Sequence, residues 1–298
     1  MLDVVGFGEN SVDLVYQLPE LPRGGAAKLP VIGRQMLPGG QVATTMAACA
    51  ALGLRAGYVG SFGDDDAGAL ARVELARRGV DIAHAIVRDA PNRHAIILVD
   101  RAGERSILWS RDAALIVRPG DVRAAWIADA GAVHVDAVDE DASIALAQMA
   151  RRAGLPVTSD IDTVTSQTAA LVAAVTVPIL AEGIAEALTG ERDAEAALRA
   201  LRRTHDGLLV VTLGARGSMM LEGDQLHVEP AFTAQAVDTT GAGDIFRAGF
   251  IYGMRRGLRG RDLLRVANAA AAVSCTRTGA MTSAPSLNEV EALLASRF

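Results

Sequence analysis

The sequence is constrained most by a regular alternation of helical patterns and short apolar runs between residues 122 and 212. Helical spacing of apolar residues occurs in Val122–Ala128, Ala142–Arg152 and Ala169–Ala174. Apolar runs such as Val177–Leu180 and Leu208–Thr212 are too short to be helices. Strands covered by helices on both faces typically have this form. The pattern therefore predicts an α/β fold with a central, mostly parallel sheet flanked by helices.

A second pattern predicts a small additional β-sheet. Apolar residues alternate with polar ones from Val12 to Leu18, and the alternation resumes at Val31–Met36 after prolines and glycines. Two further short strands are expected at Ala95–Val99 and Ser106–Trp109, around a turn. We therefore expect one domain over residues 1–298, with a small sheet formed by about residues 12–36 and 93–111.

Composition excludes several partners and cofactors. The net charge is −6, without a basic run, so nucleic acid and anionic membranes are not expected partners. No apolar stretch reaches the roughly 18 residues of a membrane span, and no signal-peptide pattern is present, which predicts a cytoplasmic protein. Lys28, the only lysine, follows Ala27, so there is no Walker loop. Gly6-Phe7-Gly8 lacks the third glycine of a dinucleotide-binding fingerprint, and the histidines lack zinc-ligand spacing.

The strongest functional signal is the string Asp-Thr-Thr-Gly-Ala-Gly-Asp at residues 238–244, which runs into a helical pattern. A helix N-terminus presents unpaired backbone N–H groups and a positive dipole end, and glycines let an anion approach them. Gly241, Ala242 and Gly243 are therefore predicted to form an anion hole. Asp244 is placed to accept the proton of an attacking hydroxyl as general base. The alternative is a tight turn in which Asp244 only caps the helix.

This string resembles the second signature of the ribokinase-like (PfkB) carbohydrate kinase family, D-T-x-G-A-G-D before a long helix. The turn at Pro38-Gly39-Gly40 resembles the first signature, and the resemblance extends over nearly the whole chain. It implies a ribokinase-like three-layer fold in which the small sheet is a lid over a sugar. It also implies transfer of the γ-phosphoryl group of ATP, with Mg²⁺, to a hydroxyl of a sugar or sugar derivative, expected to be primary.

The resemblance also assigns positions that bind the sugar. Asp13 and the Gly39-Gly40 turn would clamp it, since a carboxylate can accept hydrogen bonds from two hydroxyls. Gln41 stands where ribokinase has lysine, and Thr44 where the family signature has asparagine. The hydrogen-bond pattern therefore differs from the one expected for ribose.

Three other polar residues are weaker candidates for substrate contacts. Asp136 ends a predicted strand at the sheet edge where ligands gather, and by resemblance it touches the substrate. Arg93 and Arg111 flank the strands of the small sheet. They either hold an anionic substituent of the substrate or are ordinary surface cations, and the surface interpretation is favoured.

Resemblance further implies a nucleotide site and a monovalent-cation site, the latter for potassium. One departure from the family pattern concerns magnesium. Most members have Asn-x-x-Glu near the magnesium and phosphates, whereas residues 181–184 are Ala-Glu-Gly-Ile, so only Glu182 remains beside that motif. The implied nucleotide contacts are Thr212, Gly214, Arg216, Gly217, Gly243 and Asn268, and the implied cation ligands are Asp238, Thr240, Ser274, Arg277, Gly279 and Ser283.

Three alternative functions stay open. A nucleoside kinase of the same fold would need an aromatic side chain over the base, for which Tyr16 and Trp109 are the candidates. A kinase for an acidic or sulfonated sugar would use Arg93 and Arg111. A silent sugar-binding protein would explain the missing Asn-x-x-Glu, although the intact anion hole and Asp244 argue against it. We also expect a homodimer that forms by edge-to-edge pairing of the small sheets.

Overall fold

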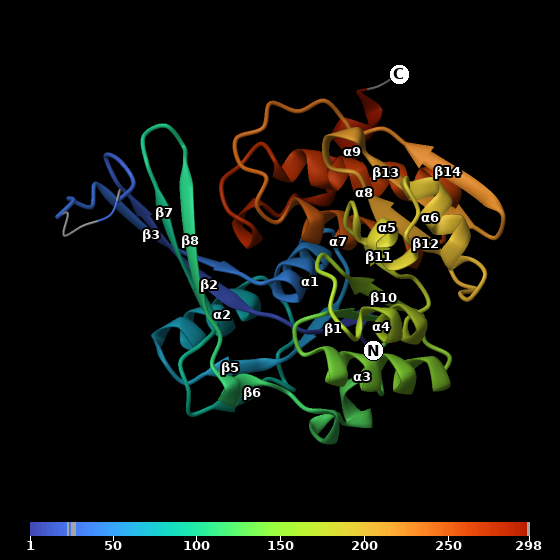
Figure 1. The fold of residues 1–298 in the computed structure, drawn as a ribbon. Coiled ribbons are helices and arrows are strands. Elements are labelled where there is room, and N and C mark those ends of the chain that lie inside the picture. Colours follow the sequence, from blue (N-terminus) through green and yellow to red (C-terminus); the bar gives the residue numbers. More distant parts are fainter. Residues whose placement is uncertain (23, 25–27, 297–298) are drawn as a thin grey trace.

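The computed structural model describes residues 1–22, 24 and 28–296, and its centre is a layer of two four-stranded sheets (Figure 1). All strands of the first sheet are parallel, in the order β10-β9-β1-β4. The second has the order β11-β12-β13-β14, with β11 and β12 parallel and the last two strands antiparallel. Parallel bridges from Thr158 to Val177 and from Ile161 to Leu180 join the two sheets. The strands are β1 Val4–Phe7, β4 Ala56–Val59, β9 Val133–Asp136, β10 Val157–Asp160, β11 Ile179–Leu180, β12 Leu209–Thr212, β13 Ser218–Glu222 and β14 Gln225–Glu229.

Helices cover both faces of this layer, which confirms the predicted α/β fold. Val5 of β1 packs into a core on one face together with Leu146 of α3. Val4 belongs to a core on the opposite face, with Met46 of α1 and Ile245 of α7. Successive residues of a strand point to opposite faces, so β1 is buried on both sides. The helices are α1 Gln41–Ala51, α2 Asp66–Arg77, α3 Glu140–Arg152, α4 Thr168–Ala174, α5 Ile184–Thr189, α6 Ala194–Leu201, α7 Ala242–Arg255, α8 Gly260–Ser274 and α9 Leu287–Ala295.

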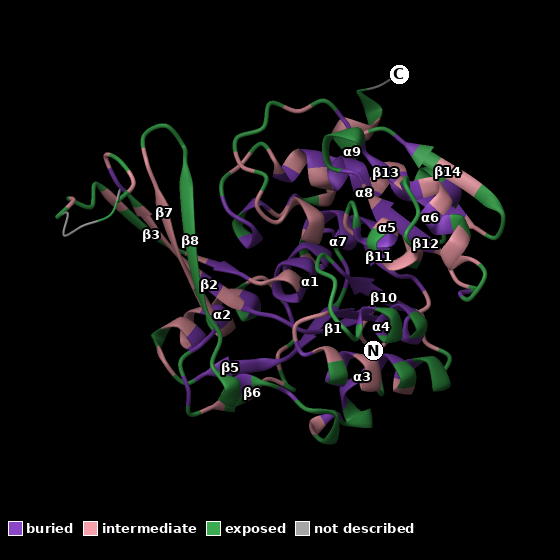
Figure 2. Ribbon diagram, in the orientation of Figure 1, coloured by how far each residue is buried: buried purple, intermediate pink, exposed green. Residues whose placement is uncertain are grey.

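A small four-stranded sheet projects from the body, in the order β3-β2-β7-β8 (Figure 1). β2 and β7 pair in parallel, whereas β3 and β8 run antiparallel to their neighbours. Every residue of the edge strand β8 is exposed (Figure 2). Residues 23 and 25–27 of the expected range 12–36 lie outside the described residues. The strands are β2 Ser11–Gln17, β3 Gly33–Gly39, β7 His94–Val99 and β8 Arg105–Ser110, and a separate parallel pair is formed by β5 Ser61–Gly63 and β6 Ile86–Arg88.

One local prediction was wrong and another was confirmed only in part. The helix expected over Val122–Ala128 is only a short 3₁₀ turn at Ala124–Trp126, which places the Trp126 ring 5.8 Å from that of Phe7 in the core. The strand expected over Val177–Leu180 is reduced to its last two residues, because Pro178 has no N–H to donate to a ladder. Among the helices of the described ranges, none combines the length and apolarity needed to cross a bilayer.

Candidate active site

The candidate site lies at the edge of the central layer where its parallel strands end. Phe7, Asp136, Asp160 and Thr212 are the last residues of β1, β9, β10 and β12. Asp136 and Asp160 are direct partners in the parallel register. Parallel strands bring the polar residues at their carboxyl ends to one edge, so residues distant in sequence meet here.

The N-terminus of α7 is built by a glycine turn at this edge. Gly241 has φ 77°, and a Cβ on it would lie 2.7 Å from the Cα of Ala280, so the turn packs against the loop after α8. The N–H of Ala242 donates to the Thr239 carbonyl at 3.2 Å. The following N–H groups of the first turn are left to bind an anion, together with the positive end of the helix dipole.

Asp244 lies in this first helical turn, beside a second carboxyl group and a guanidinium. Nη2 of Arg247 lies 2.6 Å from Oδ1 of Asp160, and both side chains are only 2–3% exposed. Burial and the Asp160 carboxylate raise the pKa of Asp244 well above its usual range, although Arg247 lowers it. Burial also raises the pKa of Asp160 to about 6. A pair of neighbouring carboxyl groups with raised pKa values is typical of acid–base sites.

One cavity, of about 310 Å³, brings together most residues predicted to bind the nucleotide. Its wall near Asn268 is apolar and suits a flat base, because Phe232, Phe246, Ala271 and Ala272 line it. The Asn268 amide itself donates to the Glu229 and Pro230 carbonyls, at 3.0 and 3.2 Å. The predicted residues that line this cavity are Thr212, Gly214, Gly217, Ala242, Gly243 and Asn268.

Arg216 does not line the cavity but makes an exposed ion pair with Glu182. The distance from Arg216 Nη2 to Glu182 Oε1 is 2.5 Å, and the two side chains are 66% and 54% exposed. Glu182 is the acid left beside the missing Asn-x-x-Glu. The pair therefore links this segment to the turn after β12 that contains Gly214 and Gly217.

A second cavity, of about 210 Å³, lies between the small sheet and the loops that flank α7 and α8. Asp13 of β2 faces it together with Asp238, Thr240 and Gly279. Burial, Glu9 and Asp238 raise the pKa of Asp13 to about 6. Residues of the string 238–244 therefore border both cavities.

The Gly39-Gly40 turn packs tightly beneath the acceptor side. A Cβ on Gly40, at φ 95°, would lie 2.5 Å from the Cα of Asn10, so only glycine fits. Gln41 donates to Asp162 at 2.7 Å. Thr44 is fully buried, and its hydroxyl has no hydrogen-bond partner among the described residues.

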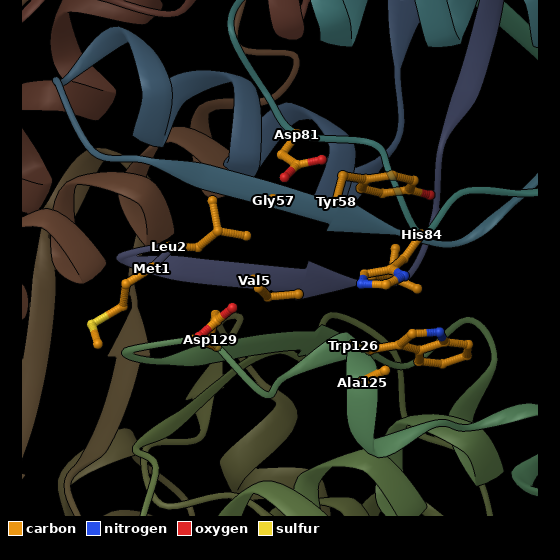
Figure 3. A pocket seen from close by; sticks show the side chains of 12 residues that line it. Met1, Leu2, Val5, Gly57, Tyr58, Asp81, His84, Ala125, Trp126 and Asp129 are labelled. Carbon is orange, nitrogen blue, oxygen red and sulfur yellow. The ribbon is translucent and has the colours of Figure 1, made fainter.

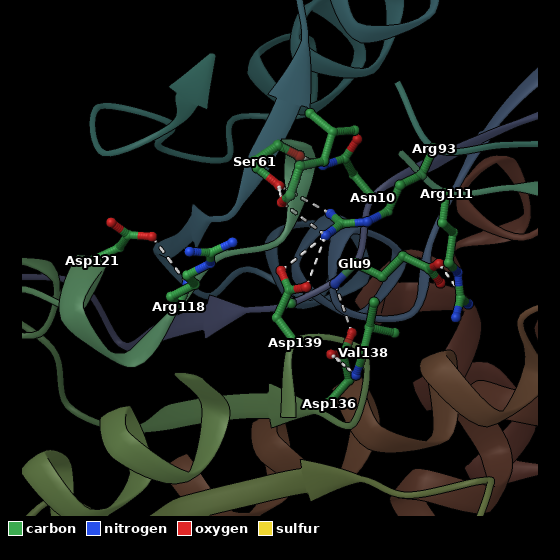
Figure 4. Close-up of polar contacts among 12 residues, drawn as sticks. Glu9, Asn10, Ser61, Arg93, Arg111, Arg118, Asp121, Asp136, Val138 and Asp139 are labelled. Carbon is green, nitrogen blue, oxygen red and sulfur yellow. Dashed lines mark hydrogen bonds and ion pairs between the residues drawn. The ribbon is translucent and has the colours of Figure 1, made fainter. Parts of the chain in front are cut away.

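Glu9 and Arg111 form an ion pair at this edge, with Asp136 beneath them (Figure 4). Nη2 of Arg111 lies 2.9 Å from Oε1 of Glu9, and its guanidinium stacks on the Trp109 ring, 5.4 Å from the centroid. Asp136 is fully buried and accepts hydrogen bonds from the N–H groups of Glu9 and Val138. The predicted substrate contact of Asp136 is therefore not supported, because its oxygens shape the turn after β1.

The favoured interpretation of Arg93 as a surface cation was wrong. Arg93 is only 2% exposed, and its Nη2 lies 2.9 Å from Oδ2 of Asp139. The guanidinium also donates to the Ser61 hydroxyl and the Leu115 carbonyl (Figure 4). These internal partners occupy its donors, so it is not placed to hold an anionic substituent of the substrate.

Replacement of Arg93 by methionine is expected to destabilise the fold by about 3–5 kcal/mol, because it leaves the buried Asp139 carboxylate unpaired. Arg55→Met is the matched control, since the Arg55 side chain of its pair with Asp3 is 62% exposed and water screens the interaction, so its loss should change stability little. Urea unfolding of both variants measures the difference. Equal losses of stability would show that the buried pair has no special role.

Asp238 ties together the two loops predicted to hold a monovalent cation. One oxygen accepts from the N–H and hydroxyl of Thr240, at 3.0 and 2.7 Å, and the other from the Gly279 N–H at 2.9 Å. Although burial opposes it, these hydrogen bonds lower the pKa of Asp238. Arg277 pairs with Glu289, and the hydroxyls of Ser274 and Ser283 donate to backbone carbonyls. Backbone oxygens are therefore the main groups that these loops offer to the predicted cation.

A further cavity, of about 200 Å³, lies along β1 and β4, from Met1 and Leu2 at one end to His84 and Trp126 at the other (Figure 3). Its lining includes Leu2, Gly57, Asp81, His84 and Trp126. None of the predicted site residues lines it within the described ranges. It is therefore separate from the anion hole and the carboxyl groups.

Four residues of the site were missed in the sequence. Glu9, Asp160 and Asp162 follow or end strands, so their position at the carboxyl edge was a usable signal. The sequence around Arg247 contained no such signal, because a single arginine in a helical pattern is usually a solvated cation. Only the packing of α7 against β10 shows that it is buried.

Comparison with known proteins agrees with this geometry. The family model described as pfkB family carbohydrate kinase matches residues 1–287. The chain is 31% identical to the ATP-dependent ribose-1-phosphate kinase of Halopiger xanaduensis, over 100% of both chains, and 28% identical to the ribokinase of Haemophilus influenzae, over 95% of both. The structure of Arabidopsis thaliana ribokinase complexed with ribose and ATP matches with a TM-score of 0.87 at 27% identity, covering 100% of this chain and 99% of that one. The resemblance found in the sequence is confirmed: this chain belongs to the pfkB family of carbohydrate kinases, phosphotransferases whose acceptor is a hydroxyl group.

Proposed function

We propose that this protein is an ATP-dependent kinase that phosphorylates a primary hydroxyl of a neutral sugar. The observation that carries the proposal is the position of the string 238–244 between two cavities. Thr239, Ala242 and Gly243 border the nucleotide-side cavity, whereas Asp238 and Thr240 border the cavity of Asp13. A base and an anion hole at this boundary lie where a phosphoryl group would pass from donor to acceptor.

In this proposal Asp13 orients the sugar through its hydroxyls, and Asp244 accepts the proton of the attacking hydroxyl. The hydroxyl oxygen forms a bond to the γ-phosphorus as the bond to the bridging oxygen of ADP breaks. The N–H groups of the first turn of α7 stabilise the negative charge on the phosphoryl oxygens. The glycines of the turn allow this close approach.

Magnesium fits the site as an ion bound mainly by the nucleotide phosphates and not by a cluster of protein side chains. No group of three or more His, Cys, Asp or Glu side chains converges on a metal position within the described ranges. Mg²⁺ commonly keeps several waters and binds substrate phosphates with one or two carboxylates, and Glu182 is the carboxylate left in the altered segment. When bound, the ion neutralises phosphate charge. A potassium ion at the Asp238 loops would add positive charge beside the anion hole.

A neutral acceptor is favoured by the charges around its cavity. Glu9 and Asp13 face the acceptor side, and the nearest cations are already paired, Arg111 with Glu9 and Arg105 with Asp238 at 3.6 Å. A nucleoside is less well supported, because no aromatic side chain is among the described residues that line this cavity. Carboxylates accept hydrogen bonds from sugar hydroxyls and repel anions.

The proposal is tested by ADP release with Mg-ATP against a panel of neutral sugars, sugar acids, sulfosugars, sugar phosphates and nucleosides. Turnover of a neutral sugar is expected, and Asp13→Asn should raise the KM for that sugar by more than about tenfold while leaving the KM for ATP unchanged. The same assay with potassium or choline as counter-ion tests the monovalent cation. Turnover of nucleosides alone, or an unchanged KM in Asp13→Asn, would contradict the proposal.

A phosphorylated sugar is the second candidate acceptor. The 31% identical relative is named an ATP-dependent ribose-1-phosphate kinase. Arg105 lines the acceptor cavity, and Arg111 pairs with Glu9; both arginines are 48% exposed and could release their carboxylate partners to bind a phosphate. If this candidate is right, the panel should show turnover of the sugar phosphate but not of the free sugar. Arg105→Ala should then abolish the preference for the sugar phosphate.

We further propose that the small sheet is a lid over the acceptor and that two copies pair through its edge. β8 is exposed along its whole length and carries Ile107, Leu108 and Trp109, which are 56–71% exposed. An unpaired apolar strand edge of this kind invites pairing. Sedimentation at micromolar concentration should show a dimer, and Ile107→Pro should convert it to a monomer because proline removes a ladder donor. A monomeric parent protein would exclude the dimer.

A further inference from the structure

Three polar side chains meet beneath the anion hole, and only Asp244 among them is accounted for by the proposed reaction. Asp160 ends β10, and Arg247 lies one turn after Asp244 on α7. Asp160 and Arg247 are both buried, whereas Asp244 keeps part of its surface open to solvent. The side chains of Asp160 and Asp244 lie within hydrogen-bonding range of each other.

The unpaired oxygens of Asp160 indicate that Asp160 and Asp244 share a proton. Neither oxygen of Asp160 accepts a hydrogen bond from an N–H or hydroxyl group of the described residues. Its ion pair with Arg247, at 2.6 Å, lacks hydrogen-bond alignment. Buried carboxyl oxygens rarely go without a donor, and two carboxyls in contact can supply one only by sharing a proton.

Arg247 also lies against the anion hole itself. A Cβ on Gly243 would be 2.7 Å from Nη1 of Arg247, so the guanidinium passes directly under the backbone of the glycine turn. One positive charge therefore faces two carboxyl groups. With one shared proton the three side chains are together neutral, which is the charge state that costs least in a buried position.

We infer that Asp160 and Arg247 are positioning residues that form a proton-sharing unit with Asp244. Asp160 takes the shared proton, which leaves Asp244 as the carboxylate that faces the acceptor. Asp244 then accepts the acceptor's hydroxyl proton as the hydroxyl oxygen bonds to the γ-phosphorus and ADP leaves with the electron pair of the broken bond. The unit then holds two protons, and one of them leaves to solvent past the exposed side of Asp244.

Other charged groups near the unit are few. Asp162 and Glu9 face Asp160, and Glu9 also faces Asp244. His134 faces Arg247 but is neutral, because burial lowers its pKa to about 3. These groups are unchanged in the variants below, so differences in pH dependence report on the unit itself.

The test is the pH profile of kcat at saturating Mg-ATP and acceptor, together with ¹³C NMR titration of the aspartate carboxyls in the free protein. In Asp160→Asn the group that takes the shared proton is lost and Asp244 is protonated more easily, so the acid limb should move to higher pH by about one unit or more, and kcat should fall about tenfold. In Arg247→Met the compensating charge is lost, so the limb should move to higher pH by about one unit or more. Arg247→Lys keeps the charge and should keep the parent limb.

Upward shifts in Asp160→Asn and Arg247→Met, together with the parent limb in Arg247→Lys, would not follow from a structural role alone. If Arg247→Met does not fold, Asp160→Asn and Arg247→Lys still decide the matter. Activity losses in these variants with an unmoved acid limb, or two aspartates that titrate independently at ordinary values in the free protein, would overturn the inference. Only the pH profile of kcat rests on the proposed function. Failure to turn over any acceptor would count against the proposed function, while the NMR titration would still test the proton-sharing unit.

Discussion

Replacement of Asp244 by asparagine is expected to lower kcat by about 10²–10⁴-fold. Asparagine has nearly the same shape but cannot accept the hydroxyl proton, so the loss falls on the chemical step. The KM for ATP should change little, because the first-turn N–H groups and the cavity near Asn268 remain. The measurement is steady-state ADP release with the acceptor found in the panel, with ATP binding followed by calorimetry.

Stability provides an independent check on this variant. A carboxyl whose pKa is raised on folding favours the folded state only while it is protonated, and that contribution is lost as pH rises through the raised pKa. Asp244→Asn should therefore have a Tm equal to or above that of the parent at neutral pH. Asp262→Asn, an exposed acid in the first turn of α8, is the matched control and should keep kcat within about twofold. A variant at 244 that retains more than about a tenth of the activity would exclude Asp244 as the base.

Replacement of Gly241 by alanine is expected to lower kcat by about 10²–10³-fold, the usual effect of losing one anion-hole donor. The added Cβ would lie 2.7 Å from both Cα and Cβ of Ala280, so the turn must shift away from the loop after α8. The N–H groups that follow would then no longer converge on the phosphoryl group. We also expect a loss of about 1–2 kcal/mol in stability from the positive φ of 77°.

Gly257→Ala is the control for Gly241→Ala, because it introduces the same backbone strain without displacing the turn before α7. Gly257 follows the other end of α7 with φ 78°, but a Cβ there meets no atom within 4 Å. The control should therefore lose similar stability and keep its kcat within about twofold. Thermal unfolding and ADP release on both variants measure the two effects. Equal kcat values in the two variants would contradict the anion-hole assignment.

The sequence predicted those parts of the fold that depend on local pattern. Apolar periodicity located the buried strands and most helices, because burial on one or both faces leaves a regular signal. The prediction for Val122–Ala128 failed because buried apolar residues, Val122, Trp126 and Ile127, give a short turn the apolar content of a helix. Pro178 shortened β11 although the run Val177–Leu180 looked uniformly apolar.

In the candidate site, too, the sequence predicted the residues that lie in contiguous motifs but not those whose partners are distant in the chain. The string 238–244 and the turn at Gly39-Gly40 are contiguous, so their residue types revealed them. Arg93 and Arg247 could not be placed, because their carboxylate partners Asp139 and Asp160 are 46 and 87 residues away in the chain. Nothing local distinguishes an arginine that is neutralised in the interior from one in solvent.

The placement of the two tryptophans gives this protein an intrinsic optical reporter. Trp126 is fixed in the interior against Phe7, whereas Trp109 is 71% exposed on β8, in contact with the Arg111 guanidinium. A soluble collisional quencher would therefore reach the emission of Trp109 and leave that of Trp126 largely untouched. Any ligand or partner that covers the outer strand of the small sheet can be followed by fluorescence without an attached dye.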